Sequence, residues 1–378
     1  MIRVYRYRLY PTRAQEERMR WTCERLRELY NAALEERREA YRRQGVSLSG
    51  YSQMTELREV RAICKEYGGI HSHLLQDAIT RLDRAYRAFF RRVKLGDNPG
   101  FPRFRGRGRY TSFTFKQAST RNGVRLCATG KRLDLTGIGK IKIKIHRPTE
   151  GRLKQVTVTL GGDGHWYACL CCDDVPTKPL PATGATVGID LGITTFVMLS
   201  TGDQIANPRH YERAQAQLAR AQRIVSRRRN KRSNRRRKAA VLLAKQHGRV
   251  RKTRLDFHHK VALDLVQRFD AIAVEDLNIK GLAGGMLAKQ IHDAAWAQFI
   301  SILASKAECA GRGFIKVDPR GTSQICSECG AEVRKKLSVR VHDCPHCGYV
   351  TDRDHNAARN VEQRAGHARR GGLIDGSP

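Results

Sequence analysis

The sequence has few acidic residues for its size. Asp and Glu number 36 against 72 Lys and Arg in 378 residues, which gives a formal net charge of +36. A chain this basic is expected to bind a polyanion, and nucleic acid is the partner that such a charge indicates. No apolar run approaches the ~18 residues that a membrane-spanning helix needs. The first residues, Met1–Arg6, also lack the apolar core of a signal peptide. We therefore expect no membrane partner.

Four of the 11 cysteines stand in two Cys-x-x-Cys pairs, Cys326/Cys329 and Cys344/Cys347, separated by fourteen residues. Each pair is followed by a glycine that permits a tight turn, and the spacing predicts one tetrahedral Zn²⁺. His346 lies between the second pair and is an alternative ligand, but four thiolates already complete the shell. A closed site of this kind is structural.

Three acidic residues stand at the ends of apolar or Ala-rich segments. Asp190 and Glu275 each end a short β-branched run that predicts a buried strand, and Asp354 opens an Ala-rich helix. Three carboxylates delivered to one place would suit two Mg²⁺ ions and phosphodiester hydrolysis. Taken singly, Asp190 is equally well a turn aspartate, Glu275 a surface acid and Asp354 a helix cap. Asp352 competes with Asp354 for the third position, and Asp276 is a weaker competitor of Glu275.

The N-terminal half is predicted to combine strands with helices. Residues 2–10 alternate as a strand, with Tyr5, Tyr7 and Leu9 on one face and Arg6 and Arg8 on the other. Helices are expected over 12–45, 52–65 and 72–94. The period-two pattern from 111 to 172 predicts an antiparallel β domain, read as a barrel that residues 2–10 complete.

Basic residues gather in two further segments. In the loop 97–110, Arg103 and Arg105 alternate with aromatic residues, a pattern that suits backbone contact and base stacking. The alternative is a plain basic loop whose aromatics belong to the core. Positions 227–238 hold nine basic residues in twelve. The flanks keep helical spacing, so a helix over 211–248 or a helical hairpin laid along phosphates is expected, followed by helices over 255–269 and 294–310. The predicted nucleic-acid contacts are Arg6, Arg8, Arg103, Arg105, Arg227, Arg228, Arg229, Lys231, Arg232, Arg235, Arg236 and Arg237.

Several of these motifs together resemble the TnpB family, the transposon-encoded RNA-guided nucleases related to type V CRISPR effectors. The motifs are Gly188–Gly192, Val274–Leu277, Thr322–Gly330 and Asp352–Ala358, with weaker matches at Tyr10–Thr12 and Gly100–Phe104. The resemblance implies a multidomain α+β fold. It contains an RNase H-like RuvC nuclease domain (183–320 and 350–369) with an inserted zinc ribbon (321–349). A β-barrel wedge domain (1–12 and 97–178) carries an inserted helical recognition domain (13–96). Residues 370–378 have little to pack against and are expected to form a disordered tail.

The same resemblance implies the chemistry and the partners. Asp190, Glu275 and Asp354 would hold Mg²⁺, and the four cysteines would hold Zn²⁺. The partners would be a guide RNA from the transposon end and double-stranded target DNA next to a short adjacent motif, with no small-molecule substrate. A monomer in the cytoplasm of a prokaryote, associated with the nucleoid, is favoured. The competing functions are a catalytically silent guide-RNA/DNA-binding regulator and a structure-specific resolvase or transposase that works without RNA.

Overall fold

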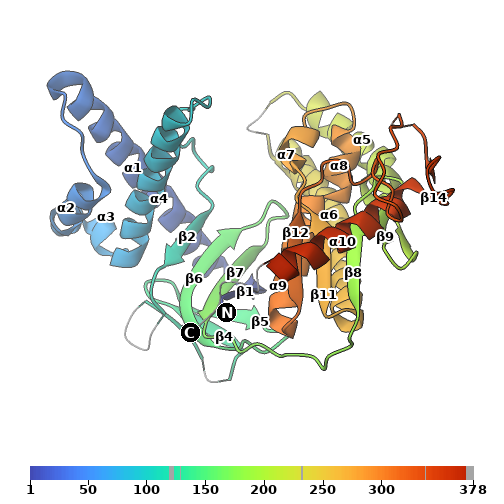
Figure 1. Ribbon diagram of the computed structural model, residues 1–378. Coiled ribbons are helices and arrows are strands. Elements are labelled where there is room, and N and C mark those ends of the chain that lie inside the picture. Colours follow the sequence, from blue (N-terminus) through green and yellow to red (C-terminus); the bar gives the residue numbers. More distant parts are fainter. Residues whose placement is uncertain (119–122, 128, 231–232, 337, 372–378) are drawn as a thin grey trace. The chain divides into compact units, whose positions relative to one another are not determined.

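The computed structural model describes residues 1–118, 123–127, 129–230, 233–336 and 338–371 (Figure 1). The chain divides into two compact units, Met1–Pro176 and Thr177–Pro378, and each is described by itself. In the described residues, no helix is both long enough and apolar enough to cross a membrane.

The N-terminal unit is built on a seven-stranded antiparallel sheet with the order β2-β6-β7-β1-β5-β4-β3. As predicted, the N-terminal strand belongs to this sheet, because β1 pairs with both β5 and β7. Its side chains alternate: Tyr5, Tyr7 and Leu9 are buried. Within the described residues no hydrogen-bond ladder joins the edge strands β2 and β3. By its hydrogen bonds the domain is therefore an open sheet with two edges, and not the closed barrel that the sequence predicted. The strands are β1 (Arg3–Tyr10), β2 (Ser112–Phe115), β3 (Val124–Leu126), β4 (Arg132–Leu135), β5 (Gly139–Lys144), β6 (Arg152–Leu160) and β7 (Trp166–Asp173).

Four helices fall between β1 and β2: α1 (Arg13–Gln44), α2 (Gly50–Ile63), α3 (Lys65–Gly68) and α4 (Ser72–Lys94). Helix α1 begins at a capping box: the Thr12 hydroxyl accepts from the Gln15 amide, and the Gln15 side chain accepts from the Thr12 amide. It ends at Gly45, whose φ of 67° is the left-handed conformation that glycine adopts without strain. Both ends of this helix were thus readable from the sequence.

The C-terminal unit contains a five-stranded mixed sheet with the order β10-β9-β8-β11-β12. The middle strand is β8, the strand that ends in Asp190. It pairs antiparallel with β9 on one side and parallel with β11 on the other, and β11 pairs parallel with β12. The strands are β8 (Thr186–Asp190), β9 (Thr195–Leu199), β10 (Gln204–Ala206), β11 (Ala271–Glu275) and β12 (Gly313–Val317).

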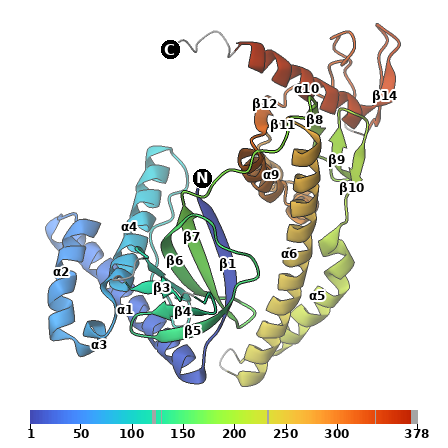
Figure 2. The ribbon, with the colours of Figure 1, turned by 90° about the horizontal axis from the view of Figure 1, so that it is seen from below.

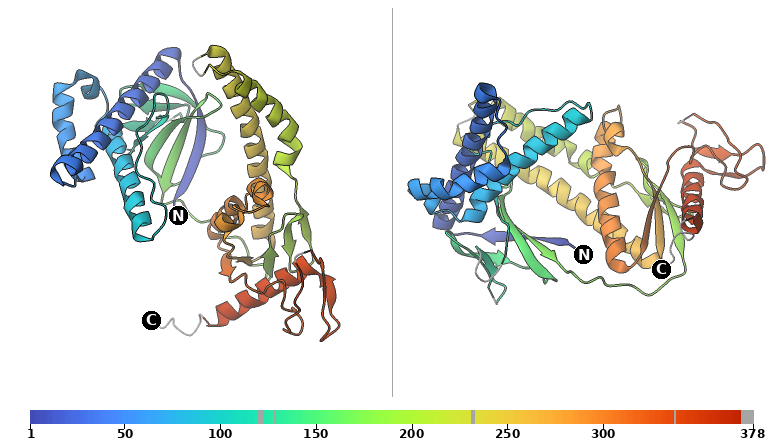
Figure 3. Two further views of the ribbon diagram at one scale, coloured as in Figure 1. Left: turned by 90° about the horizontal axis from the view of Figure 1, so that it is seen from above. Right: turned by 60° about the vertical axis from the view of Figure 1, so that its left-hand side comes forward.

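Helices cover both faces of this sheet. On one face α6 (Asn234–Arg268) and α9 (Trp296–Ala310) share a core with Val187, Ile189, Ile272 and Val274 of the two central strands. On the other face α10 (Arg353–Gly371) packs against Ala273. The right panel of Figure 3 shows the sheet lying between α9 and α10. Two short helices, α7 (Ile279–Leu282) and α8 (Ala288–Ala294), precede α9.

The basic segment forms a helical hairpin made of α5 (His210–Arg227) and α6 (Figure 2). The hairpin was one of the two predicted arrangements. The prediction of a separate helix over 255–269 was wrong, because α6 runs unbroken from Asn234 to Arg268. Gly248, the predicted end of the first helix, lies inside α6. The predicted disordered tail, 370–378, falls almost wholly outside the described residues.

Candidate active site and zinc ribbon

Asp190 and Glu275 end two neighbouring parallel strands. Ile189 of β8 pairs with Val274 of β11, so the two carboxylates come next along their strands. Side chains alternate along a strand. Because Ile189 and Val274 belong to the core on the α6 side, Asp190 and Glu275 fall on the opposite face, which α10 covers. The carboxyl ends of parallel strands are the usual place for a site in such sheets.

Helix α10 brings Asp354 to the same place. Its backbone lies directly against β8 at Gly188, where an added Cβ would sit 2.1 Å from the Ala358 carbonyl oxygen. At Gly192, just after β8, an added Cβ would lie 3.9 Å from Oδ2 of Asp354. The structure therefore gathers the three predicted carboxylates at one end of the sheet.

The two competing acids have other tasks. Asp352 precedes α10, and its Oδ1 accepts from the amides of Asp354 (2.8 Å) and His355 (3.2 Å), which makes it the cap of this helix. Asp276 is exposed and binds the ammonium group of Lys316 at 2.8 Å. Asp352 and Asp276 therefore do not belong to the carboxylate group.

The gathered carboxylates carry excess negative charge. Burial raises the pKa of Asp190 well above that of an ordinary aspartate, and the nearby charges of Glu275 and Asp354 raise it further, while Arg353 opposes them. Burial also raises the pKa of Glu275, against a hydrogen bond from Thr322. A bound cation would relieve this repulsion.

Two arginines that the sequence did not single out contact Asp354. Arg353 lies 2.9 Å from Oδ1, and Arg340, from the segment between the two cysteine pairs, lies 3.4 Å from Oδ2. An arginine next to a helix-capping motif has no distinctive spacing, so the sequence held no signal for either contact.

The four predicted cysteines meet at one point. Their sulfur atoms all lie within 4.8 Å of one another, and the Cys326–Cys347 and Cys329–Cys344 pairs are 3.7 Å and 3.6 Å apart. Ligands 2.3 Å from a tetrahedral Zn²⁺ are separated by about 3.8 Å, so the thiolates fit zinc. His346 is exposed and is not part of this group. Among the described residues no other set of His, Cys, Asp and Glu meets this spacing. Asp190, Glu275 and Asp354 therefore do not offer one oxygen each such that all three oxygens lie within 4.8 Å of one another.

Helix α10 also holds the ribbon of residues 321–349 through two asparagines, Asn356 and Asn360. Asn356 accepts from the Ser327 amide at 2.9 Å and donates to the Ile325 carbonyl at 2.8 Å. Asn360, one turn later, donates to the carbonyls of Thr322 and Ile325. Both asparagines are buried. Two polar residues spaced by four in an Ala-rich helix are the signal that would have found them.

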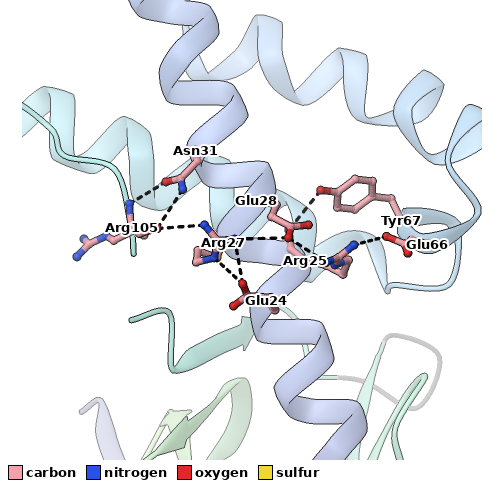
Figure 4. A network of polar contacts seen from close by, with 8 residues as sticks. All are labelled: Glu24, Arg25, Arg27, Glu28, Asn31, Glu66, Tyr67 and Arg105. Carbon is pink, nitrogen blue, oxygen red and sulfur yellow. Dashed lines mark hydrogen bonds and ion pairs between the residues drawn. The ribbon is translucent and has the colours of Figure 1, made fainter. Parts of the chain in front are cut away.

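The predicted nucleic-acid contacts of the N-terminal unit lie on the sheet and on the loop after α4. The Arg6 guanidinium stacks 3.9 Å from the Tyr167 ring, and Arg8 bonds to His165. Figure 4 shows how the backbone of Arg105 is fixed to α1: its amide donates to Asn31 and its carbonyl accepts from Asn31 and Arg27. The side chains of Arg103 and Arg105 remain exposed. The two interpretations of this loop each fit in part, because Phe101 and Phe104 are exposed and Tyr110 is buried.

The arginines of the α5–α6 hairpin divide into two groups. Arg228 donates to the carbonyl of Arg235, and Arg236 donates to the carbonyls of Val225 and Arg228, so these two side chains close the turn. Four others are exposed and open to a partner: Arg227, Arg229, Arg235 and Arg237. The predicted contacts Lys231 and Arg232 lie outside the described residues.

Known protein families and one solved structure resemble this chain. Residues 169–285 match the OrfB_IS605 model, described as a probable transposase, and 296–361 match the Cas12f1-like TNB domain. Residues 1–45, which here form β1 and α1, match a model described as a helix-turn-helix domain. A Cas12f1 chain solved with sgRNA and target DNA has a TM-score of 0.57 at 13% identity and covers 96% of this chain and 98% of its own. The fold is thus the multidomain α+β fold seen in Cas12-type effectors.

Two proteins with similar sequences show which family the chain belongs to. A putative RNA-guided DNA endonuclease of Streptomyces pristinaespiralis is 36% identical over 378 residues, covering 95% of this chain and 88% of that protein. The putative RNA-guided DNA endonuclease InsQ of Escherichia coli (strain K12) is 28% identical, with 97% and 93% covered. The chain belongs to the TnpB family, which is related to the type V CRISPR effectors, as the motifs predicted.

Proposed function

We propose that this chain is an RNA-guided DNA endonuclease and that Asp190, Glu275 and Asp354 form its nuclease centre. The observation that carries the proposal is the meeting of these three carboxylates, from two strand ends and one helix start, on the face that α10 covers. Membership of the TnpB family and the names of the two relatives support the activity. The sheet of the C-terminal unit then corresponds to an RNase H-like RuvC domain.

The donor set fits Mg²⁺. Carboxylate oxygens are the ligands that this ion prefers, and the charge repulsion at Asp190 is what a cation would relieve. Two Mg²⁺ ions would supply an activated water and stabilise charge on the leaving oxygen. Asp190, at the end of the middle strand, would contribute to holding both ions. Arg340 and Arg353 form ion pairs with the Asp354 carboxylate. The four thiolates would hold one structural Zn²⁺.

The partners follow from charge and family. A net charge of +36 suits a guide RNA paired with target DNA, because pairing supplies sequence discrimination while the protein grips the backbone. We assign the sheet of the N-terminal unit to the wedge domain and α1–α4 to the recognition domain. Recognition of a short motif beside the target would license unwinding.

Two experiments test the function. RNA that copurifies with the full chain is sequenced, and one discrete structured RNA is expected; random RNA would favour an RNA-independent resolvase. The complex is then given target plasmid with Mg²⁺. Asp190→Asn should abolish cleavage and retain RNA binding, while Asp276→Asn, the matched surface control, should cleave normally. A parent complex that binds its target without cutting it would favour the silent regulator.

A further inference from the structure

Thr322 links the zinc ribbon to a member of the carboxylate group. It lies four residues before Cys326 and is buried. Its hydroxyl oxygen is 2.6 Å from Oε1 of Glu275 and 3.0 Å from the carbonyl oxygen of Pro319. A hydroxyl has one proton to donate, and an ionised carboxylate is the stronger acceptor. The geometry therefore directs that proton to Glu275.

The position of Thr322 depends on α10. Its carbonyl accepts from Nδ2 of Asn360 at 2.8 Å, and the same Nδ2 donates to Ile325 at 2.7 Å. Asn360 is buried and comes six residues after Asp354 on the same helix. One chain of hydrogen bonds thus connects the helix that carries one carboxylate to the side chain of another.

We propose that Thr322 is a positioning residue that orients Glu275 for a divalent cation, and that Asn360 keeps Thr322 in place. The proposal rests on the proposed function of the carboxylate group. The hydrogen bond engages Oε1 and leaves Oε2 as the oxygen through which Glu275 would bind a cation. Glu275 has three rotatable side-chain bonds, and a fixed donor at one oxygen removes most of that freedom. Groups that orient metal ligands change metal affinity or activity by about 10- to 100-fold when they are removed.

The variant Thr322→Val removes the hydroxyl and keeps the shape, whereas Thr322→Ser keeps the hydroxyl. Binding of Mn²⁺ to the full-length protein without RNA is measured by the electron paramagnetic resonance of free Mn²⁺. We expect Thr322→Val to weaken Mn²⁺ binding by about 10-fold or more and Thr322→Ser to bind within about 3-fold of the parent. Thr253, whose hydroxyl bonds to the Arg249 carbonyl on the exposed side of α6, gives the control Thr253→Val.

The same variants are assayed for cleavage by the guide-RNA complex over a range of Mg²⁺ concentrations. Thr322→Val should require about 10-fold more Mg²⁺ for half-maximal cleavage, with unchanged RNA binding. If Thr322→Val does not fold, Thr322→Ala removes the hydroxyl without adding volume and takes its place. Parent-like Mn²⁺ affinity in the variant that lacks the hydroxyl overturns the proposal, and so does a Ser variant as weak as the Val variant.

Asn360→Asp tests the second step, because it keeps the shape and removes the donor. The double variant combines Thr322→Val with Asn360→Asp. If Asn360 acts through Thr322, this double variant should bind Mn²⁺ no more weakly than Thr322→Val alone. If its loss of affinity equals the product of the two single losses, the two residues act independently. Asp190→Asn distinguishes a failure of the proposed nuclease centre from a failure of the positioning role of Thr322. If it leaves Mn²⁺ binding unchanged, the proposed nuclease centre fails, whereas if it weakens binding and Thr322→Val does not, only the positioning role fails.

Discussion

Gly188 sets the distance between the helix and the strand that carry two of the three carboxylates. In Gly188→Ala the new methyl group would lie 2.1 Å from the Ala358 carbonyl oxygen and 2.5 Å from the Glu362 amide nitrogen, both backbone atoms of α10. A carbon–oxygen contact needs about 3.3 Å. Helix α10 must therefore retreat from β8 by about 1.2 Å, since backbone atoms cannot turn aside as a flexible side chain can.

Two effects of different size are expected. Forcing extra volume into a packed interface costs about 1–3 kcal/mol, which lowers the melting temperature of a unit of this size by about 2–12 °C. Cleavage should fall by about 100-fold, because a displacement near 1 Å exceeds the roughly 0.5 Å tolerance of a preorganised site. Guide-RNA binding should be retained. The loss of activity thus exceeds what the loss of stability explains at a temperature where the variant is folded.

The assay is plasmid cleavage by the guide-RNA complex, with the folded fraction followed by differential scanning calorimetry. Gly366→Ala is the matched control, because Gly366 lies in the same helix and an added Cβ there meets nothing within 4 Å. That variant should cleave normally and gain about 0.5–1 kcal/mol of stability. Parent-like cleavage and melting in Gly188→Ala would refute the argument that this glycine sets the position of α10.

Three further predictions concern charge, helix and ribbon. The pKa of Asp190 is raised in the folded chain, so the stability present below the ordinary aspartate pKa of about 3.9 is lost as pH rises through the raised value. Without divalent cations the melting temperature of the parent should fall with rising pH relative to Asp190→Asn, and Mg²⁺ should reduce the difference; parallel curves would contradict this. Gly248→Ala in α6 should add about 0.5–1 kcal/mol by calorimetry, and a lower melting temperature would count against an unbroken α6. Removing zinc with a chelator should expose residues 321–349 to limited proteolysis, whereas an unchanged digest would speak against a zinc-held ribbon.

The sequence predicted the elements whose cause is local. The β-branched runs before Asp190 and Glu275 form strands, and the capping box at Thr12 begins α1, because each signal lies within a few residues. The break expected at Gly248 did not occur. A glycine inside a helix costs only about 1 kcal/mol relative to alanine, and no proline or cluster of turn residues follows it to end α6.

The separation of Asp352 from Asp354 shows what the sequence could not decide. Both are acids beside the start of one helix, and the cap position follows from the backbone conformation before α10 rather than from residue type. In the structure the Asp352 carboxylate accepts hydrogen bonds from two backbone amides of the first turn. Asp352 therefore caps α10, and Asp354 is the acid that joins the carboxylate group. The contacts of Thr322 with Glu275 and of Asn360 with Thr322 span 47 and 38 positions. Contacts of that range depend on the packing of whole elements, which no short motif encodes.

Different kinds of contact place the three carboxylates, and this decides how each is disturbed. The register of two parallel strands sets Asp190 beside Glu275, and a strand register is fixed by every residue of the ladder at once. Asp354 depends on the helix α10, whose backbone lies against β8 at Gly188 and which bonds to the ribbon through Asn356 and Asn360. Because these contacts lie outside the hydrogen-bond ladder of the sheet, substitutions at the helix or the ribbon should alter cation affinity while the sheet stays intact. Substitutions inside β8 or β11 should instead lower stability and activity together.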